Sequence, residues 1–375
     1  MQYRAYGKTG KMLSALGFGA MRLPKDPDYA VEVMRRYLDL GGNIIDTARA
    51  YGDSEALVEQ AVAGRRDQVY ISTKNHALAR WADEAYADRW QQFFDESLAA
   101  LGTDHIDFYH LHDVCWDKLE VALRKPHGVL SIIQRAQDEG LIAHLCFSSH
   151  DSPANIIKII DTGLFAGMIV QYNLFDCIPA SGGHAAGISN EPAIAYAHER
   201  GLGVMTMGTV AGGRLVMAAE SPQFQELMAR LSAPIPDLAI RYVLANPGVT
   251  AALSGMNTIE MVEQNIASAS HEQPLSADEY EQIRTVVESN RKLAELYCTG
   301  CGYCQPCPEG INIPQALAAM NYHRVWGLTD YAKRIYGGLD PKADACVECG
   351  QCEEKCPQHL PVAERLRETH QTLSE

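Results

Sequence analysis

The chain has 375 residues, of which 47% are hydrophobic and 21% charged, so it can build a full core and has room for one large and one smaller domain. Its formal net charge of −15 argues against nucleic-acid binding, because phosphates require surfaces rich in Lys and Arg. The stretch from Met1 to Lys8 is not a signal peptide and no apolar run approaches membrane-spanning length, so we expect a cytoplasmic protein with no membrane partner.

The first predicted element is a hairpin around the turn Gly7-Lys8-Thr9-Gly10. Strand and helix patterns then alternate, and many of the helical segments end at a glycine, where a helix stop is expected. The predicted strands are residues 15–20, 43–48, 69–74, 105–112, 142–149, 167–173, 203–208 and 249–255. Repeated strand-then-helix units favour an α/β fold with a closed parallel barrel, although a doubly wound sheet would show similar alternation.

The pattern changes after the last of these units. Ser276 and Glu279 form a capping box that predicts a long polar helix running towards residue 296. Eight of the eleven cysteines follow residue 297, in a segment that is helical in its middle (313–338) and at its end (361–373) by pattern. We therefore expect a barrel domain over residues 1–275, and a connector helix with a small, mostly helical cysteine domain over residues 276–375.

Three consecutive predicted strands end in chemically useful side chains, and barrel enzymes keep their catalytic groups at that rim. Asp46 ends the first, with Tyr51 in the loop that follows it; Lys74 and His112 end the next two. An ammonium about 4 Å from a phenol is worth roughly 4 kcal/mol at an effective dielectric of about 20, or about three pKa units, so Lys74 could make Tyr51 a usable acid. Taken singly, Lys74 could be a solvated strand end and His112 a satisfied core histidine. His110 shares a strand face with His112 and is expected one layer deeper, in a structural role.

The ordered motifs Asp46-Thr47-Ala48-x-x-Tyr51-Gly52, a strand ending in Lys74, and Asp107-Phe108-Tyr109-x-Leu111-His112 resemble the signature series of the aldo-keto reductases. The resemblance covers roughly residues 1–275. It implies a (β/α)8 TIM barrel, a reduced nicotinamide cofactor, NAD(P)H, and a small-molecule carbonyl substrate. It also implies a catalytic tetrad, with Tyr51 as proton donor beside Lys74, Asp46 and His112.

The same resemblance implies the residues that bind the cofactor. Those that would contact the nicotinamide are Ser148, Ser149, Gln171 and Met207, the last in place of the family's usual aromatic side chain. Those that would contact the pyrophosphate and the adenosine half are Gly212, Gly213, Arg214, Ser254, Gln264 and Asn265. The family's basic positions for the 2′-phosphate of NADPH fall on Gly255, Met256 and Met261, so we expect NADH to be favoured or both coenzymes to be accepted.

The cysteines form two runs, Cys298-x2-Cys301-x2-Cys304-x2-Cys307-Pro308 and Cys346-x2-Cys349-x2-Cys352-x3-Cys356-Pro357. The second run has the spacing of bacterial two-cluster ferredoxins, and the first is one residue shorter before its last cysteine. We predict two 4Fe-4S clusters, one held by Cys298, Cys301 and Cys304 with Cys356, the other by Cys346, Cys349 and Cys352 with Cys307. Zinc is the alternative, since it also accepts paired Cys-x2-Cys ligands. Barrel and tail together resemble the iron–sulfur branch of the aldo-keto reductases.

Two functions follow from this reading. The first is an NAD(P)H-dependent carbonyl reductase whose clusters exchange electrons, with a ferredoxin or another carrier as the partner considered. The second is an electron-transfer or redox-sensing iron–sulfur protein that uses the barrel as a docking module. The complete tetrad favours the first, because a barrel without catalysis has no use for four placed polar groups.

Overall fold

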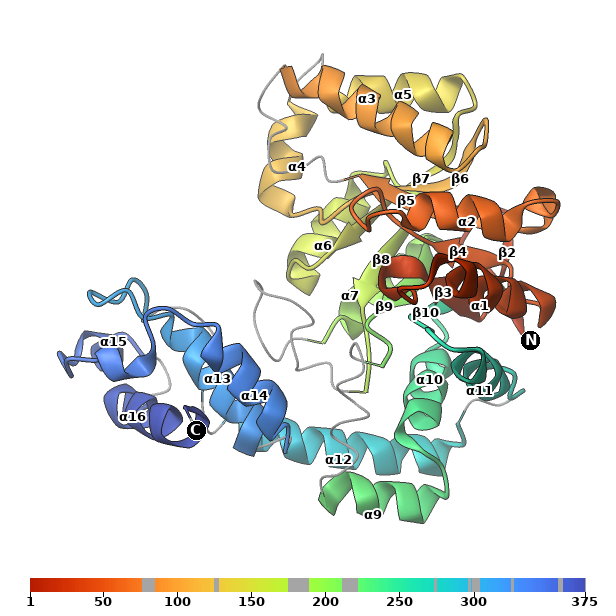
Figure 1. Cartoon of the computed structure of the whole chain (residues 1–375). Helices are drawn as coiled ribbons and strands as arrows, with labels where there is room; N and C mark the ends of the chain where they lie inside the picture. Colours follow the sequence, from red (N-terminus) through yellow and green to blue (C-terminus); the bar gives the residue numbers. More distant parts are fainter. Residues whose placement is uncertain are drawn as a thin grey trace. The chain divides into compact units, whose positions relative to one another are not determined.

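A computed structural model describes residues 1–75, 85–124, 128–174, 189–210, 222–272, 275–295, 298, 304–324, 327–356 and 360–374 (Figure 1). The described elements form two compact units. The first contains every strand and helices α1 to α7, α10 and α11; the second contains α9 and helices α12 to α16. Helix α9 comes from the range expected for the barrel domain, and the division between residues 275 and 276 stays a prediction.

The first unit is a closed barrel of parallel strands in the order β10-β3-β4-β5-β6-β7-β8-β9. Pairing of β10 with both β9 and β3 closes the ring, which confirms the barrel and excludes the doubly wound sheet. The strands are β3 (Leu16–Gly19), β4 (Ile44–Asp46), β5 (Tyr70–Asn75), β6 (Ile106–Leu111), β7 (Ile142–Ser149), β8 (Gly167–Gln171), β9 (Gly203–Met207) and β10 (Ala251–Ser254). Each lies within or close to the range predicted for it.

The predicted hairpin is the antiparallel pair β1 (Tyr3–Ala5) and β2 (Met12–Ser14). Leu13 in β2 and Tyr6 in the turn between the strands are buried, and both belong to the hydrophobic cluster inside the barrel. Gly7 has φ +53°, and a Cβ there would lie 2.4 Å from the backbone nitrogen of Gly203, so this close approach requires glycine. The hairpin therefore supplies side chains that close the base of the barrel.

Helices connect successive strands and cover the outside of the barrel (Figure 1). Local signals explain their starts: Asp26 caps α1 by accepting hydrogen bonds from the backbone N–H groups of Asp28 and Tyr29, and Ser152 caps α6 in the same way. The helices are α1 (Pro27–Asp39), α2 (Ser54–Val62), α3 (Ala85–Ala100), α4 (Trp116–Leu123), α5 (Val129–Asp138), α6 (Pro153–Asp161), α7 (Glu191–Arg200), α10 (Ile235–Ala245) and α11 (Ile259–Ala269), with short 3-10 turns η1 (Ala20–Arg22) and η2 (Arg66–Gln68).

Side chains inside the barrel form an apolar layer below a polar one. Because side chains alternate along a strand, every second residue points inward. The apolar layer includes Tyr6, Phe108, Cys146, Ile169 and Met205. Two residues further along β5, β6 and β7 the inward positions are polar. The barrel thus has a hydrophobic base and a polar mouth.

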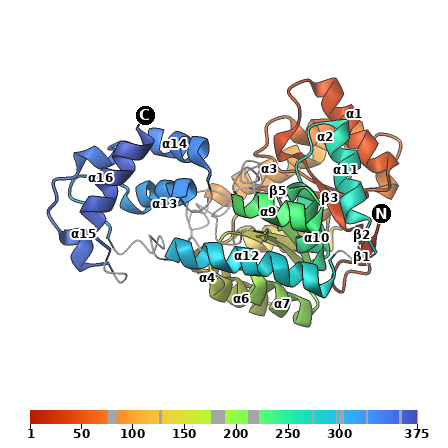
Figure 2. The same cartoon turned by 90° about the horizontal axis from the view of Figure 1, so that it is seen from below.

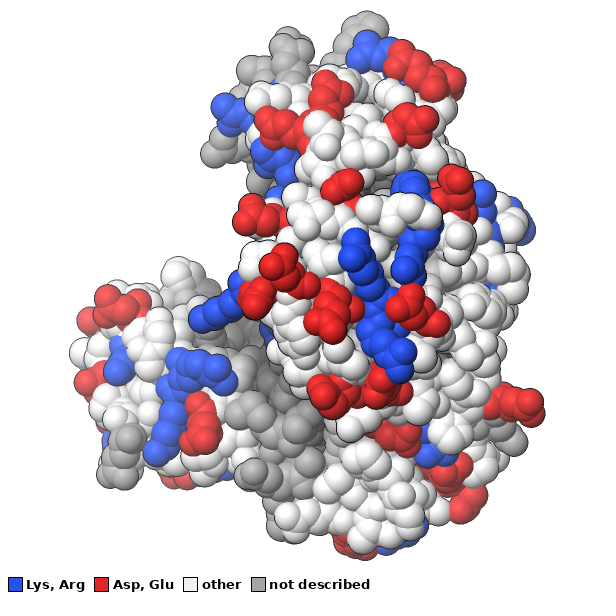
Figure 3. All heavy atoms as spheres, turned by 45° about the vertical axis from the view of Figure 1, so that its right-hand side comes forward, with Lys and Arg blue, Asp and Glu red and all other residues white. Residues whose placement is uncertain are grey.

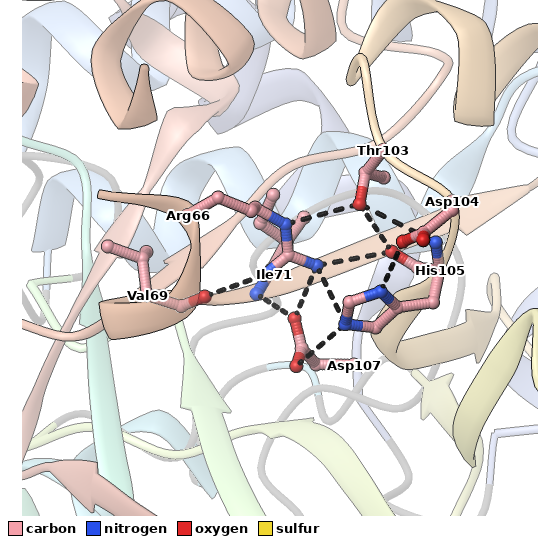
Figure 4. A network of polar contacts seen from close by, with 7 residues as sticks. All are labelled: Arg66, Val69, Ile71, Thr103, Asp104, His105 and Asp107. Atoms are coloured by element: carbon pink, nitrogen blue, oxygen red, sulfur yellow. Dashed lines mark hydrogen bonds and ion pairs between the residues drawn. The ribbon is translucent and has the colours of Figure 1, made fainter. Parts of the chain in front are cut away.

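A polar network joins β5 and β6 at the base of the barrel (Figure 4). Asp107 Oδ2 accepts a hydrogen bond from the backbone N–H of Ile71 at 2.9 Å and lies 2.9 Å from the guanidinium of Arg66. Arg66 also donates to the backbone oxygens of Val69 and His105, at 2.8 and 3.1 Å. Asp107 is only 10% exposed, so this network satisfies backbone groups that are shielded from water and sets how β5 meets β6.

The second unit is helical: α9 (Pro222–Leu231), α12 (Ala277–Glu295), α13 (Ile313–Arg324), α14 (Thr329–Gly337), η5 (Ala343–Ala345), α15 (Gln351–Glu354) and α16 (Val362–Leu373). Helix α12 begins directly after Ser276, at the predicted capping box. Helices α13, α14 and α16 pack against one another (Figure 2), and they carry the buried side chains of Ile313, Tyr336 and Leu366. The Tyr336 hydroxyl accepts from the backbone N–H of Ala343 at 3.0 Å and lies 2.8 Å from His370 Nδ1.

Charged side chains of both signs are interspersed on the face drawn in Figure 3, where a stripe of basic groups is bordered by acidic ones. Several arginines of the barrel unit are paired: Arg65 lies 2.7 Å from Asp39 and Arg36 lies 2.6 Å from Glu263. Among the described residues, no helix has the length and apolar character needed to cross a lipid bilayer.

Candidate active site and metal centre

Strands β4, β5 and β6 are direct neighbours in the barrel, so their carboxyl ends bring Asp46, Lys74 and His112 together. Lys74 Nζ donates to Asp46 Oδ2 at 2.5 Å and to the backbone oxygen of Thr47 at 2.7 Å. The side chains of Lys74 and Asp46 are 4% and 7% exposed. A buried ion pair of this kind fixes the ammonium group in one place and direction.

Tyr51 lies in the loop after β4, above this ion pair. The loop turns tightly, with the N–H of Tyr51 bonded to the oxygen of Ala48 at 2.9 Å and with Gly52 at φ +62°. Lys74 Nζ lies 5.2 Å from the centre of the Tyr51 ring. The ring of His112 meets that of Tyr51 edge-on, with centres 6.1 Å apart. The structure therefore gathers all four residues of the predicted tetrad at one end of the barrel.

Burial raises the pKa of Tyr51 above its usual value of 10.0. The charge of Lys74 and a hydrogen bond from it act in the opposite direction, and Asp46 adds to the rise. Lys74 thus lowers the pKa of Tyr51, as expected, but the rise caused by burial is larger. Tyr51 is a neutral phenol near physiological pH, which is the form that can donate a proton.

Two inward residues below the tetrad extend it into the barrel, and of these the sequence analysis missed Ser72. The Ser72 hydroxyl donates to Asp46 Oδ1 at 2.6 Å, and Ser72 Oγ lies 3.2 Å from His110 Nδ1. His110 is fully buried one layer below His112, as expected. Strand alternation was the available signal, because Ser72 precedes Lys74 by two positions and so shares its face.

On the outer side of β5, Thr73 donates a hydrogen bond to Glu55 Oε1 at 2.6 Å. Glu55 belongs to the first turn of α2 and is 5% exposed. Burial raises the pKa of this carboxyl, while Thr73, Ser97, Arg49 and Lys74 act to lower it. This contact, also missed from the sequence, ties the helix that follows the Tyr51 loop to the strand that carries Lys74.

Ser148 and Ser149 end β7 and differ in orientation. Ser148 shares the inward face with Cys146, and its buried Oγ accepts from the N–H of Asp113 at 3.0 Å. Among the described residues, its hydroxyl hydrogen has no acceptor. Ser149 faces the other way: it donates to the oxygen of Val114 at 2.6 Å and accepts from the N–H of Asp151 at 3.0 Å. Ser148 thus offers a donor at the mouth, whereas Ser149 holds the loop after β6.

The other predicted cofactor residues are placed as follows. Gln171 ends β8 and is 9% exposed, and half-buried Met207 ends β9 against the apolar layer. Asn265 Nδ2 donates to Ser254 Oγ at 3.1 Å, which joins α11 to the end of β10, and Gln264 is exposed. Three predicted contacts lie outside the described residues: Gly212, Gly213 and Arg214.

In the second unit, five cysteines line one small cavity: Cys304, Cys307, Cys346, Cys349 and Cys352. No disulfide joins the described cysteines, Cys298 and Cys356 included, and Cys301 lies outside the described residues. In the described part of the chain, no three ligating side chains already form a group that would hold a metal ion. The convergence of sulfur donors from both runs on one cavity nevertheless fits an iron–sulfur cluster, which thiolates hold.

Comparison with known proteins places both units. The model of the aldo/keto reductase family matches residues 15–288, and that of the 4Fe-4S dicluster domain matches residues 297–360.

L-galactose dehydrogenase of Arabidopsis thaliana is 26% identical over 78% of this chain and 96% of its own length. The aldo-keto reductase YhdN of Bacillus subtilis is 26% identical over 77% of this chain and 94% of its own length. The holo structure of the aldo-keto reductase AKR11C1 from Bacillus halodurans is 26% identical with a TM-score of 0.63, covering 76% of this chain and 96% of its own. An aldo/keto reductase from Klebsiella pneumoniae solved with NADP and acetate shares the fold, at 24% identity, a TM-score of 0.59 and coverage of 75% and 94%.

Proposed function

The chain belongs to the aldo/keto reductase family and is an oxidoreductase, and on this premise we propose that it reduces an aldehyde or ketone by hydride transfer, with Tyr51 as the proton donor. The observation that carries the proposal is the neutral, half-buried phenol of Tyr51 over the Lys74–Asp46 ion pair. A bound NAD(P)H would supply the hydride.

Each tetrad residue then has a distinct task. Tyr51 holds the proton that the carbonyl oxygen takes up as hydride arrives at its carbon. Lys74 stabilises the phenolate that forms, because an ammonium close to a developing anion lowers its energy most in a site shielded from water. Asp46 keeps Lys74 charged and aimed, and His112 donates a hydrogen bond that orients the substrate carbonyl.

The mouth of the barrel offers groups for the nicotinamide ring. The free hydroxyl hydrogen of Ser148 can reach a carboxamide oxygen, and Gln171 lies on the adjacent strand. Met207 provides an apolar surface for the ring, less specific than an aromatic one. We assign Ser149 a supporting role at the same rim, because its hydroxyl already holds the backbone of Val114.

We further propose that NADH is favoured or that both coenzymes are accepted. Helix α11 carries no Lys or Arg, and Glu260 in its first turn is exposed. Of the two methionines at the family's basic positions, Met256 is fully buried and Met261 is 43% exposed. A 2′-phosphate would therefore lose charged hydrogen bonds, each worth roughly 1.5–3 kcal/mol.

For the second unit we propose two 4Fe-4S clusters, ligated as the spacing predicts. The shared cavity brings Cys307 of the first run next to Cys346, Cys349 and Cys352, as one ligand set requires, although Cys304, which the spacing assigns to the other cluster, lines it too. Such clusters supply one-electron chemistry, and a ferredoxin or similar carrier would be the partner that exchanges those electrons.

The test of the reductase is turnover of a simple aldehyde with NADH and NADPH, followed by Tyr51→Phe. This variant should lower kcat by a factor on the order of 10³, because general acid catalysis is lost, and change coenzyme Kd less than about threefold. Tyr70→Phe, at the base of the same barrel, is the matched control and should keep wild-type kcat. Full activity in Tyr51→Phe would refute the assignment of the proton donor.

A further inference from the structure

Two buried side chains, Ser72 and His110, continue downward from Asp46 of the ion pair as one chain of hydrogen bonds. Ser72 Oγ lies 2.6 Å from Asp46 Oδ1 and 3.2 Å from His110 Nδ1. Ser72 and His110 have no exposed surface, and Asp46 is 5% exposed. The chain starts on β6, crosses β5 and ends on β4, and therefore links the strands that carry the tetrad.

Counting donors fixes the direction of this chain. Asp46 is ion-paired and can only accept, so the single hydroxyl hydrogen of Ser72 points to Oδ1. If Ser72 Oγ accepts from His110, the imidazole hydrogen is on Nδ1; the backbone groups of Phe108 and Thr73 also form hydrogen bonds with this ring. His110 Nε2 is left as an acceptor and has no hydrogen-bond partner among the described residues.

His110 stabilises the folded protein less than an aliphatic side chain would at this buried position. Burial and the charge of Lys74 hold the pKa of His110 well below its usual value of 6.5, so the ring is neutral. A buried nitrogen without a partner costs free energy that an aliphatic side chain would not. What an aliphatic side chain lacks is the Nδ1 hydrogen.

We propose that His110 is a positioning residue: its Nδ1 hydrogen locks the Ser72 hydroxyl towards Asp46 and so fixes the carboxylate that aims Lys74 at Tyr51. A serine hydroxyl is a rotor, and a donor behind it leaves it one favourable direction. Aligned hydrogen bonds also polarise one another, which strengthens the bond to Asp46. The inference rests on the proposed carbonyl reduction, and it adds a residue that touches neither substrate nor coenzyme.

Kinetics test the positioning role. His110→Leu should lower kcat roughly tenfold and leave KM within about twofold, because a misaimed Lys74 weakens the transition state more than substrate binding. His110→Asn keeps an N–H near the Nδ1 position and should retain most of kcat. His144→Leu, at a half-buried histidine at the base of β7, is the matched control and should behave as wild type.

A double-mutant cycle tests the route through Ser72. In a Ser72→Ala background, His110→Leu should cost less than about twofold in kcat, since the link is already broken. A full tenfold loss in that background, or equal losses in His110→Asn and His110→Leu, would overturn the proposal.

The imidazole tautomer gives a readout that needs no turnover. Nitrogen NMR of the wild-type protein should show a hydrogen on Nδ1 and none on Nε2 of His110, and Ser72→Ala should shift the Nδ1 signal. A hydrogen on Nε2 would overturn the proposal even in an active enzyme. Absence of wild-type turnover with any aldehyde would instead refute the proposed function, and the NMR result would still decide the hydrogen-bonded chain.

Discussion

At Tyr51, burial and charge act in opposite directions on one proton. A pairwise estimate predicts that Lys74 lowers the phenol pKa by about three units. In the structure, burial reverses the net direction. In the proposed reaction, the charge of Lys74 would therefore stabilise the phenolate that forms, whereas the resting Tyr51 side chain keeps its proton.

Glu55 gives a prediction about stability and pH. Because its pKa is raised in the folded protein, the folded state favours the protonated carboxyl. Its contribution is then most favourable below the unfolded pKa and is lost as pH rises through the folded pKa. Glu55→Gln keeps an acceptor for Thr73 and removes the charge, so its Tm should exceed that of wild type at pH 8 by more than at pH 4. The same Tm difference at both pH values would contradict this account.

Among the elements, the first turn of α11 is expected to set coenzyme preference. Met261→Arg places a guanidinium at an exposed position where a 2′-phosphate would be bound. It should raise the ratio of kcat/KM for NADPH to that for NADH by roughly tenfold or more, since a charged hydrogen bond is worth about 1.5–3 kcal/mol. Met261→Gln serves as the uncharged control. A wild-type preference for NADPH beyond a hundredfold would contradict the proposal that this region lacks contacts for the 2′-phosphate.

The start of strands β5 and β6 depends on Asp107. Asp107→Ala leaves the N–H of Ile71 without its acceptor and removes the carboxylate beside Arg66, so the free energy of unfolding should fall by about 1–3 kcal/mol. The control is Glu120→Ala, which breaks a surface pair with Arg124 whose side chains are 44% and 73% exposed and should cost less than about 1 kcal/mol. If a denaturant titration showed the same loss of unfolding free energy in both variants, the Asp107 network would stabilise the fold no more than the surface pair does.

For the whole molecule, the two cysteine runs predict about eight irons per chain after anaerobic purification. Cys307→Ser and Cys356→Ser should each disrupt one cluster and remove about four irons, because the last cysteine of each run serves the other run's cluster. Iron and sulfide analysis with electron paramagnetic resonance measures both. Zinc in place of iron would refute the assignment.

We also expect the clusters to be redox-active. If they resisted reduction at every accessible potential while turnover proceeded, the cysteine domain would have a structural role only.

The sequence predicted the alternation of strands and helices, and its resemblance to a known family predicted the barrel and its rim. Hydrophobic periods of two and of 3.6 residues are local patterns, so strands and helices can be read from them. Because a parallel barrel places the carboxyl ends of its strands at one rim, Asp46, Lys74 and His112 could be grouped from the sequence. The motif order supplied Tyr51, and the cysteine spacing supplied the two-run cluster domain, which the family comparison supports.

Only the tertiary structure decided what depends on neighbours distant in the chain. The net direction of the Tyr51 pKa follows from burial, which no local pattern reports. The chain from His110 through Ser72 to Asp46 needs the register of three strands, and the opposite orientations of Ser148 and Ser149 need the direction of β7 in the closed barrel. Cys307 of the first run shares a cavity with the second run because folding brings them together across about forty residues. Residue spacing in the sequence identifies which side chains can act together. Their burial, the direction of their hydrogen bonds and their hydrogen-bond partners depend on how the folded chain packs.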